Sequence, residues 1–144
     1  MRQIVFRGRT PEKSYKGSRW IFGDLFRTIG TDGVGIQYWD EEDGWMTEDV
    51  HDSTVGEYTG FYDTNGQPIF EGDILKSRIK KFEHIPYVVG YREGIFETRP
   101  NNQDLASMPL KYLLNDDDEG TTLKSWTIIG NVHDNPELMK GGEG

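Results

Sequence analysis

The chain has 144 residues and a mass of 16.5 kDa, which suits one domain or two very small subdomains. Its net charge of −9 speaks against general binding to nucleic acid, because the phosphate backbone would repel it. The absence of cysteine excludes disulfides and thiol chemistry, and no apolar run approaches the ~20 residues of a bilayer span. We therefore expect a soluble protein of a reducing cytoplasm, with no membrane contact.

The first half of the chain is typical of short strands separated by turns. Residues 4–8, 20–26 and 34–39 are apolar or aromatic runs of strand length, and Gly23 suggests a bulge or bend in the second of them. Residues 45–47 follow the polar turn of residues 40–44. This pattern predicts a hairpin in which Gly44 adopts a positive φ.

The second half continues the pattern and is marked by strong turn signals. Asp63-Thr64-Asn65-Gly66 is a tight turn, because Asn and Gly tolerate the left-handed region. Predicted strands follow at residues 69–70, from 74 to about 82, at 87–91 and 95–98 as a second hairpin, and at 126–132. The β pattern lapses only over residues 103–114, where apolar residues fall near helical spacing.

About eight short strands with regularly spaced turns predict a mainly β protein, a β-rich α+β fold. Its eighteen glycines suit many tight turns and would each cost about 1 kcal/mol inside a helix. We expect an N-terminal β subdomain over residues 1–60 and a C-terminal SH3-like small β-barrel over 61–140. At most one short helix is expected, near 103–114, and residues 141–144 should be a disordered tail.

The residues that could carry catalysis or bind a metal form no recognisable motif. His51, His84 and His133 lack the spacing of a zinc pair. An EF-hand beginning at Asn115 would need a glutamate at position 126, which is a tryptophan. Asp24, Glu71 and Asp73 could meet in space, but Asp73 is better interpreted as the hydrogen-bond acceptor of its own turn. We therefore assign no catalytic, cofactor-binding or metal-binding residue, and no cofactor.

A basic segment runs against the acidic charge of the whole chain. It contains Lys76, Arg78, Lys80 and Lys81. If the strand continues through it, Lys76, Arg78 and Lys80 point to one face, where they could contact nucleic acid or an acidic partner. The alternative is an edge strand that its lysines protect against unwanted pairing. The net charge favours the alternative.

Several stretches together resemble the YopX-like family of phages and prophages. In order and spacing these are Phe6–Gly8, Trp20–Leu25, Thr54–Phe61, Ile69–Ile74, Ile128–Val132 and Asn135–Leu138. The resemblance implies a small β-rich protein that is encoded by a mobile element, acts in a bacterial host and self-associates. It implies no activity and no functional residues.

The leading hypothesis is thus a non-enzymatic phage or prophage protein that forms homo-oligomers and binds a host or phage protein. One alternative is a nucleic-acid-binding small barrel that uses the basic segment at residues 76–81. Another is a hydrolase that acts through clustered carboxylates or histidines. A last one, resting on charge alone, is an acidic surface that mimics DNA.

Overall fold

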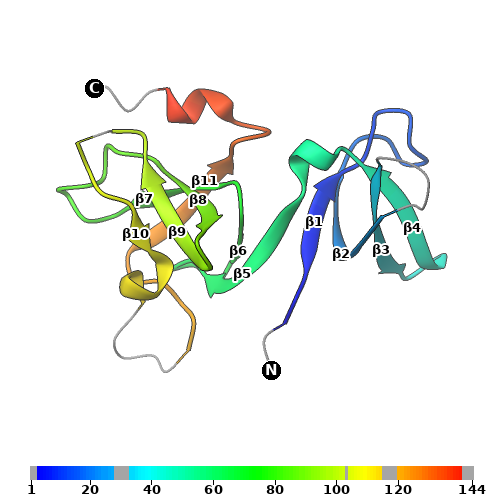
Figure 1. Cartoon of the computed structure of the whole chain (residues 1–144), viewed down its shortest axis with the longest axis horizontal. Coiled ribbons are helices and arrows are strands. Elements are labelled where there is room, and N and C mark those ends of the chain that lie inside the picture. The colour runs from blue at the N-terminus through cyan, green and yellow to red at the C-terminus, as the bar shows by residue number, and fades with distance from the viewer. Residues whose placement is uncertain (1–2, 28–32, 103, 115–119, 141–144) are drawn as a thin grey trace. The chain divides into compact units, whose positions relative to one another are not determined.

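The computed structural model describes residues 3–27, 33–102, 104–114 and 120–140, and the chain divides into two compact units (Figure 1). The first unit is Met1–Tyr58 and the second is Thr59–Gly144, so the division falls inside one strand. No described helix is long and apolar enough to cross a membrane.

The first unit is an antiparallel sheet. Its elements are β1 (Phe6–Arg9), β2 (Trp20–Arg27), β3 (Val34–Asp40), β4 (Gly44–Val50), the 3₁₀ turn η1 (Asp52–Thr54) and the first part of β5 (Gly56–Tyr62). The strand order is β4-β3-β2-β1-β5, and each neighbouring pair is antiparallel. The predicted hairpin is confirmed, with Gly44 at a φ of 76°.

The core of this unit is small and closely packed. Its buried residues are Ile21, Val34, Ile36 and Val50. Gly23 lies where β2 changes partner, because β1 pairs with Trp20–Gly23 and β3 pairs with Asp24–Arg27, and the bulge or bend expected there stays a prediction. The glycine permits a close approach, because a Cβ at this position would lie 2.0 Å from the carbonyl oxygen of Gln37.

The second unit holds the rest of the strands. Its elements are the end of β5, β6 (Pro68–Phe70), β7 (Asp73–Ser77), β8 (Tyr87–Arg92), β9 (Ile95–Pro100), β10 (Met108–Pro109), the 3₁₀ turn η2 (Leu110–Leu113), β11 (Trp126–Asn131) and the 3₁₀ turn η3 (Pro136–Met139). Five of the strands form an antiparallel sheet in the order β10-β9-β8-β7-β11. The core below it includes Tyr87 and Trp126, whose rings meet edge to face with centroids 5.0 Å apart.

The turn after β5 is organised by one buried carboxylate. Asp63 is 1% exposed, and its Oδ1 accepts the N–H groups of Asn65 and Gln67, each at 2.9 Å. Its Oδ2 accepts the N–H of Ile128 at 3.0 Å and so ties the turn to β11. Gly66 completes the predicted turn with a φ of 83°.

The mainly β class is confirmed. Among the described strands β10 and β11 form the two edges of the five-stranded sheet, and the SH3-like form of this unit stays a prediction. The described residues contain no α-helix and three short 3₁₀ turns, one of which, η2, lies where at most one short helix was expected. Residues 141–144 and most of the acidic loop, 115–119, lie outside the described residues.

Candidate functional site

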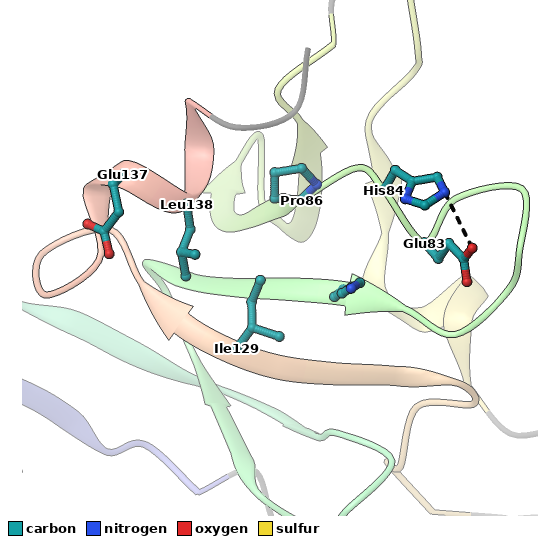
Figure 2. A pocket seen from close by; sticks show the side chains of 7 residues that line it. Glu83, His84, Pro86, Ile129, Glu137 and Leu138 are labelled. Atoms are coloured by element: carbon teal, nitrogen blue, oxygen red, sulfur yellow. Dashed lines mark ion pairs between the residues drawn. The ribbon is translucent and has the colours of Figure 1, made fainter. Parts of the chain in front are cut away.

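An open pocket of about 610 Å³ lies on the second unit, where side chains from four segments meet (Figure 2). Lys76 comes from β7, Ile129 from β11, and Glu137 and Leu138 from η3, while the segment between β7 and β8 provides the remaining side chains. Those remaining residues are Glu83, His84 and Pro86. Ile129, Leu138 and Pro86 give the pocket an apolar lining with charged groups around it.

The pocket brings together one histidine and one carboxylate as an ion pair. His84 Nε2 lies 3.3 Å from Glu83 Oε1, and the His84 side chain is 80% exposed. Figure 2 shows Glu137 on the other side of the pocket from this pair. None of the described lining residues carries a hydroxyl or thiol nucleophile. The described part of the pocket therefore lacks the pairing of a side-chain nucleophile with a base that acyl transfer needs.

The other chemically active residues singled out in the sequence are spread over the chain. His51 lies in the first unit, and His133 follows β11 in the second. Asp24 belongs to the first unit, while Asp73 belongs to the second and accepts the Phe70 N–H at 2.8 Å, which confirms its expected place in the turn. Among the residues that the structure describes, no three histidine, aspartate or glutamate side chains gather as a metal site would require.

The basic segment leaves the sheet after one residue. Lys76 is exposed on β7, but the strand ends at Ser77 and not near residue 82 as expected. Arg78 donates its N–H to the carbonyl of Ser125 at 2.8 Å, and Lys80 and Lys81 lie exposed beyond it. The alternation of a strand therefore does not apply to them. The edge-strand alternative is also wrong, because β7 lies between β8 and β11.

A partly buried ion cluster joins three elements of the first unit. Arg19 donates to the hydroxyl of Tyr38 at 2.8 Å and pairs with the carboxylate of Glu48, which also accepts from Tyr38. Burial, together with the hydrogen bond and charge of Glu48, raises the pKa of Tyr38 above its usual value. Burial alone would lower the pKa of Arg19, but Glu48 outweighs it and the pKa is raised. The cluster ties the start of β2 to β3 and β4, which is a structural role.

The opposite face of the same hairpin presents two tryptophans to solvent. Trp39 on β3 and Trp45 on β4 are cross-strand partners and are 61% and 65% exposed. Their ring centroids lie 5.5 Å apart, with the ring planes at 78° to each other. Asp40 holds the turn between them, because its Oδ1 accepts the N–H groups of Glu42 at 2.8 Å and Asp43 at 3.0 Å. The two rings are therefore presented on a defined hairpin.

The tryptophan pair, Trp39 and Trp45, belongs to a wider exposed face. Phe22 on β2 is 49% exposed, and a shallow pocket of about 330 Å³ lies on this sheet. Its lining residues are Asp24, Leu25, Phe26, Gln37 and Thr47. The sequence pattern predicted the hairpin but did not identify the exposed aromatic face that it carries. The available signal was the alternation of β3, which places Ile36 and Tyr38 on one side and Trp39 on the other.

Two antiparallel sheets joined by tight glycine turns define a small, mainly β protein. Within that class the chain belongs to the YopX protein family, whose model matches residues 16–140. The expected family is thus confirmed. No curated protein matches the chain. Among solved structures, the crystal structure of protein EF1440 from Enterococcus faecalis is similar, with 20% identity and a TM-score of 0.49 over 96% of this chain and 99% of that one.

Proposed function

We propose that this chain is a phage- or prophage-encoded, non-enzymatic protein of the bacterial cytoplasm that self-associates and binds a protein partner. The observation that supports the proposal is the tryptophan pair. Two large apolar rings that are each more than half exposed keep a substantial area in water, and tryptophan is the residue type most enriched at binding hot spots. A partner surface that covers the rings would stabilise the complex through their burial.

The state of the acidic groups supports the non-enzymatic part of the proposal. General acid–base catalysis needs a carboxyl that is free to exchange a proton with a substrate. The Asp63 carboxylate accepts hydrogen bonds from three backbone N–H groups, and the Glu48 carboxylate accepts hydrogen bonds from Arg19 and Tyr38. These two carboxylates thus serve the fold.

The test compares the wild-type chain with a Trp39→Ala/Trp45→Ala variant in light scattering and in affinity capture from lysate of phage-infected cells. Tyr112→Ala serves as the matched control, because Tyr112 is 73% exposed on the second unit. We expect the wild type and the control to self-associate and to capture the same partner, and the double variant to lose one or both abilities. A wild-type chain that stays monomeric and captures nothing reproducibly would refute the proposal.

One specific observation favours a second function, the binding of single-stranded nucleic acid by the basic segment. Lys76, Arg78, Lys80 and Lys81 are all exposed within six residues of chain. Replacing Lys80 and Lys81 with Gln should then weaken binding to an oligothymidine and reduce its salt dependence. Absence of binding at low salt refutes it.

A hydrolase acting through His84 and Glu83 is a third function, which their 3.3 Å pairing in the pocket favours. It predicts turnover of an activated phosphate ester that is lost in His84→Ala. Turnover that persists in the variant, or no turnover at all, removes it.

A further inference from the structure

The strand β4 forms the outer edge of the first unit's sheet, and directly beyond its end the N–H of His51 bonds back to the carbonyl of Arg9 on β1 at 2.9 Å. In the described sheet β4 comes last in the order β4-β3-β2-β1-β5. It pairs with β3 over seven residue pairs, from Val34–Val50 to Asp40–Gly44, with no shift of register. Natural sheets protect such an edge with charged side chains, proline or a bulge; the charged residues of β4 are Glu48, which pairs with Arg19, and Asp49, and neither proline nor lysine occurs in the strand. The edge is therefore suited to pairing with a further strand.

The direction in which the edge backbone points follows from one hydrogen bond. Thr10 donates its N–H to the carbonyl of Arg19 at 2.9 Å, which fixes which residues of β2 bond to β1. In an antiparallel sheet, the backbone N–H and C=O groups of successive residues point alternately to the two neighbouring strands. The pairings of β1 with β2, of β2 with β3 and of β3 with β4 extend this pattern from Thr10 to β4. The N–H and C=O groups of Trp45, Thr47 and Asp49 consequently point away from the sheet. Three donors and three acceptors are thus arranged as a template for an added strand.

The chemistry around this edge favours a positively charged occupant. The hairpin of residues 34–50 contains six acidic residues and no lysine or arginine. Three of them, Glu41, Glu42 and Asp43, are exposed in the turn beside the tryptophan pair, while Asp40 pairs with Lys16 at 3.4 Å. The faces of the Trp39 and Trp45 rings also attract cations, arginine above all. The shallow pocket of about 330 Å³ on this sheet is lined by both Asp24 and Thr47, so it places a further carboxylate near the edge strand.

We propose that the partner of this protein carries an extended segment rich in lysine and arginine, which adds to β4 as a further strand and lays a cation against Trp39 and Trp45. The inference rests on the proposed function and adds the binding mode and the class of partner. Charge favours this occupant over a second copy of the chain, since every copy carries a net charge of −9.

The probe is the capped peptide acetyl-Thr-Lys-Val-Arg-Val-Lys-Thr-amide, titrated into the full chain by calorimetry at low and physiological salt. Two matched peptides serve as controls: one with glutamate in place of each basic residue, and one with N-methyl groups on alternate backbone nitrogens. We expect the basic peptide to bind and the acidic one not to bind. N-methylation should weaken binding about tenfold or more, because it removes edge hydrogen bonds worth about 1 kcal/mol each.

The first protein variant is Thr47→Pro, with Thr47→Val as its control. The N–H of Thr47 points away from β3, so proline removes an edge donor without removing a bond of the existing sheet. We expect Thr47→Pro to abolish binding of the basic peptide while Thr47→Val retains it. The circular dichroism spectrum checks that both variants are folded. If the proline variant does not fold, the N-methylated peptide tests the same point on the wild-type chain.

The second variant neutralises the turn through Glu41→Gln, Glu42→Gln and Asp43→Asn, and leaves Asp40 in place because it holds the turn. A control of equal charge on the second unit changes three other exposed residues, Glu93→Gln, Asp104→Asn and Glu137→Gln. We expect the turn variant to weaken peptide binding about fivefold or more and the control to change it much less, because screened long-range charge contributes less than nearby carboxylates.

The outcomes separate this inference from the proposed function. If the wild-type chain stays monomeric and captures nothing, the proposed function fails. If the wild-type chain does both and Trp39→Ala/Trp45→Ala loses them, while the basic peptide does not bind or binds Thr47→Pro as well as the wild type, the proposed function stands and the inference is overturned. Loss of self-association in Thr47→Pro without peptide binding would assign the edge to a second copy of the chain, which also overturns the inference.

Discussion

Replacing Asp63 should be among the most damaging single changes in the second unit. Its carboxylate is buried and accepts three backbone N–H groups, from Asn65, Gln67 and Ile128. A hydrogen bond to a charged acceptor contributes about 1.5–3 kcal/mol, and a buried donor left unpaired costs about 1–3 kcal/mol. The two exposed turn donors can form hydrogen bonds with water once the carboxylate is removed, which reduces the total cost. We therefore expect Asp63→Ala to lower the free energy of unfolding by about 3–5 kcal/mol. That is a large share of the 5–15 kcal/mol typical of a domain.

The variant Asp63→Asn separates the hydrogen bonds within the turn from the hydrogen bond to Ile128. Its remaining oxygen can serve the turn, but its NH₂ group then faces the N–H of Ile128, so about 1–3 kcal/mol should be lost. Urea unfolding followed by tryptophan fluorescence measures both variants, since the buried Trp126 reports on the second unit. The exposed Asp104→Ala is the control. Equal stability of Asp63→Ala and the control, or an Asn variant as damaging as the Ala variant, would refute the reasoning.

Three further changes test other parts of the molecule. Gly23→Ala should destabilise the first unit by about 1–3 kcal/mol in urea unfolding, because its Cβ would overlap the backbone of β3, whereas Gly90→Ala, with open space around the position, should not. Gly66→Ala should cost about 1 kcal/mol through its φ of 83° alone, as measured by thermal unfolding, and a neutral result would contradict the turn geometry. Folding raises the pKa of Tyr38, so the protonated hydroxyl stabilises the fold below the ordinary value of 10.0, and this stabilisation is lost as the pH rises through the folded-state pKa. Between neutral pH and pH about 11, the Tyr38→Phe variant should therefore lose less stability than the wild type.

Local chemistry made the turns predictable from the sequence. Gly44 and Gly66 both adopt the positive φ expected of them, because a tight turn leaves few alternatives to glycine. The second predicted hairpin is present as β8 and β9, joined by Glu93 and Gly94 with φ values of 54° and 83°. In each case the determining residues lie within four positions of one another in the chain.

Features that depend on distant residues could not be predicted in this way. The strand β7 ends at Ser77 opposite the first residue of its partner β11, Trp126, and the preceding Ser125, far along the chain, adopts a φ of 66°. The same holds for the candidate site. The exposure of Trp39 and Trp45 depends on which face of the hairpin is packed against the core. The alternation of residues along the strands shows which side chains share a face, but it does not show which face is buried.

The long-range hydrogen bond between Asp63 and Ile128 affects the order in which the chain folds during synthesis. The residue that satisfies the Oδ2 of Asp63, Ile128, is made 65 residues later. The strands of the first unit, by contrast, are all present once Tyr58 has emerged from the ribosome. We therefore expect the first unit to fold while translation continues, and the second to await its last strand, since loop closure over such a span is slow. Ribosome-bound chains stalled before β11 should accordingly show a protected N-terminal half and a protease-sensitive remainder.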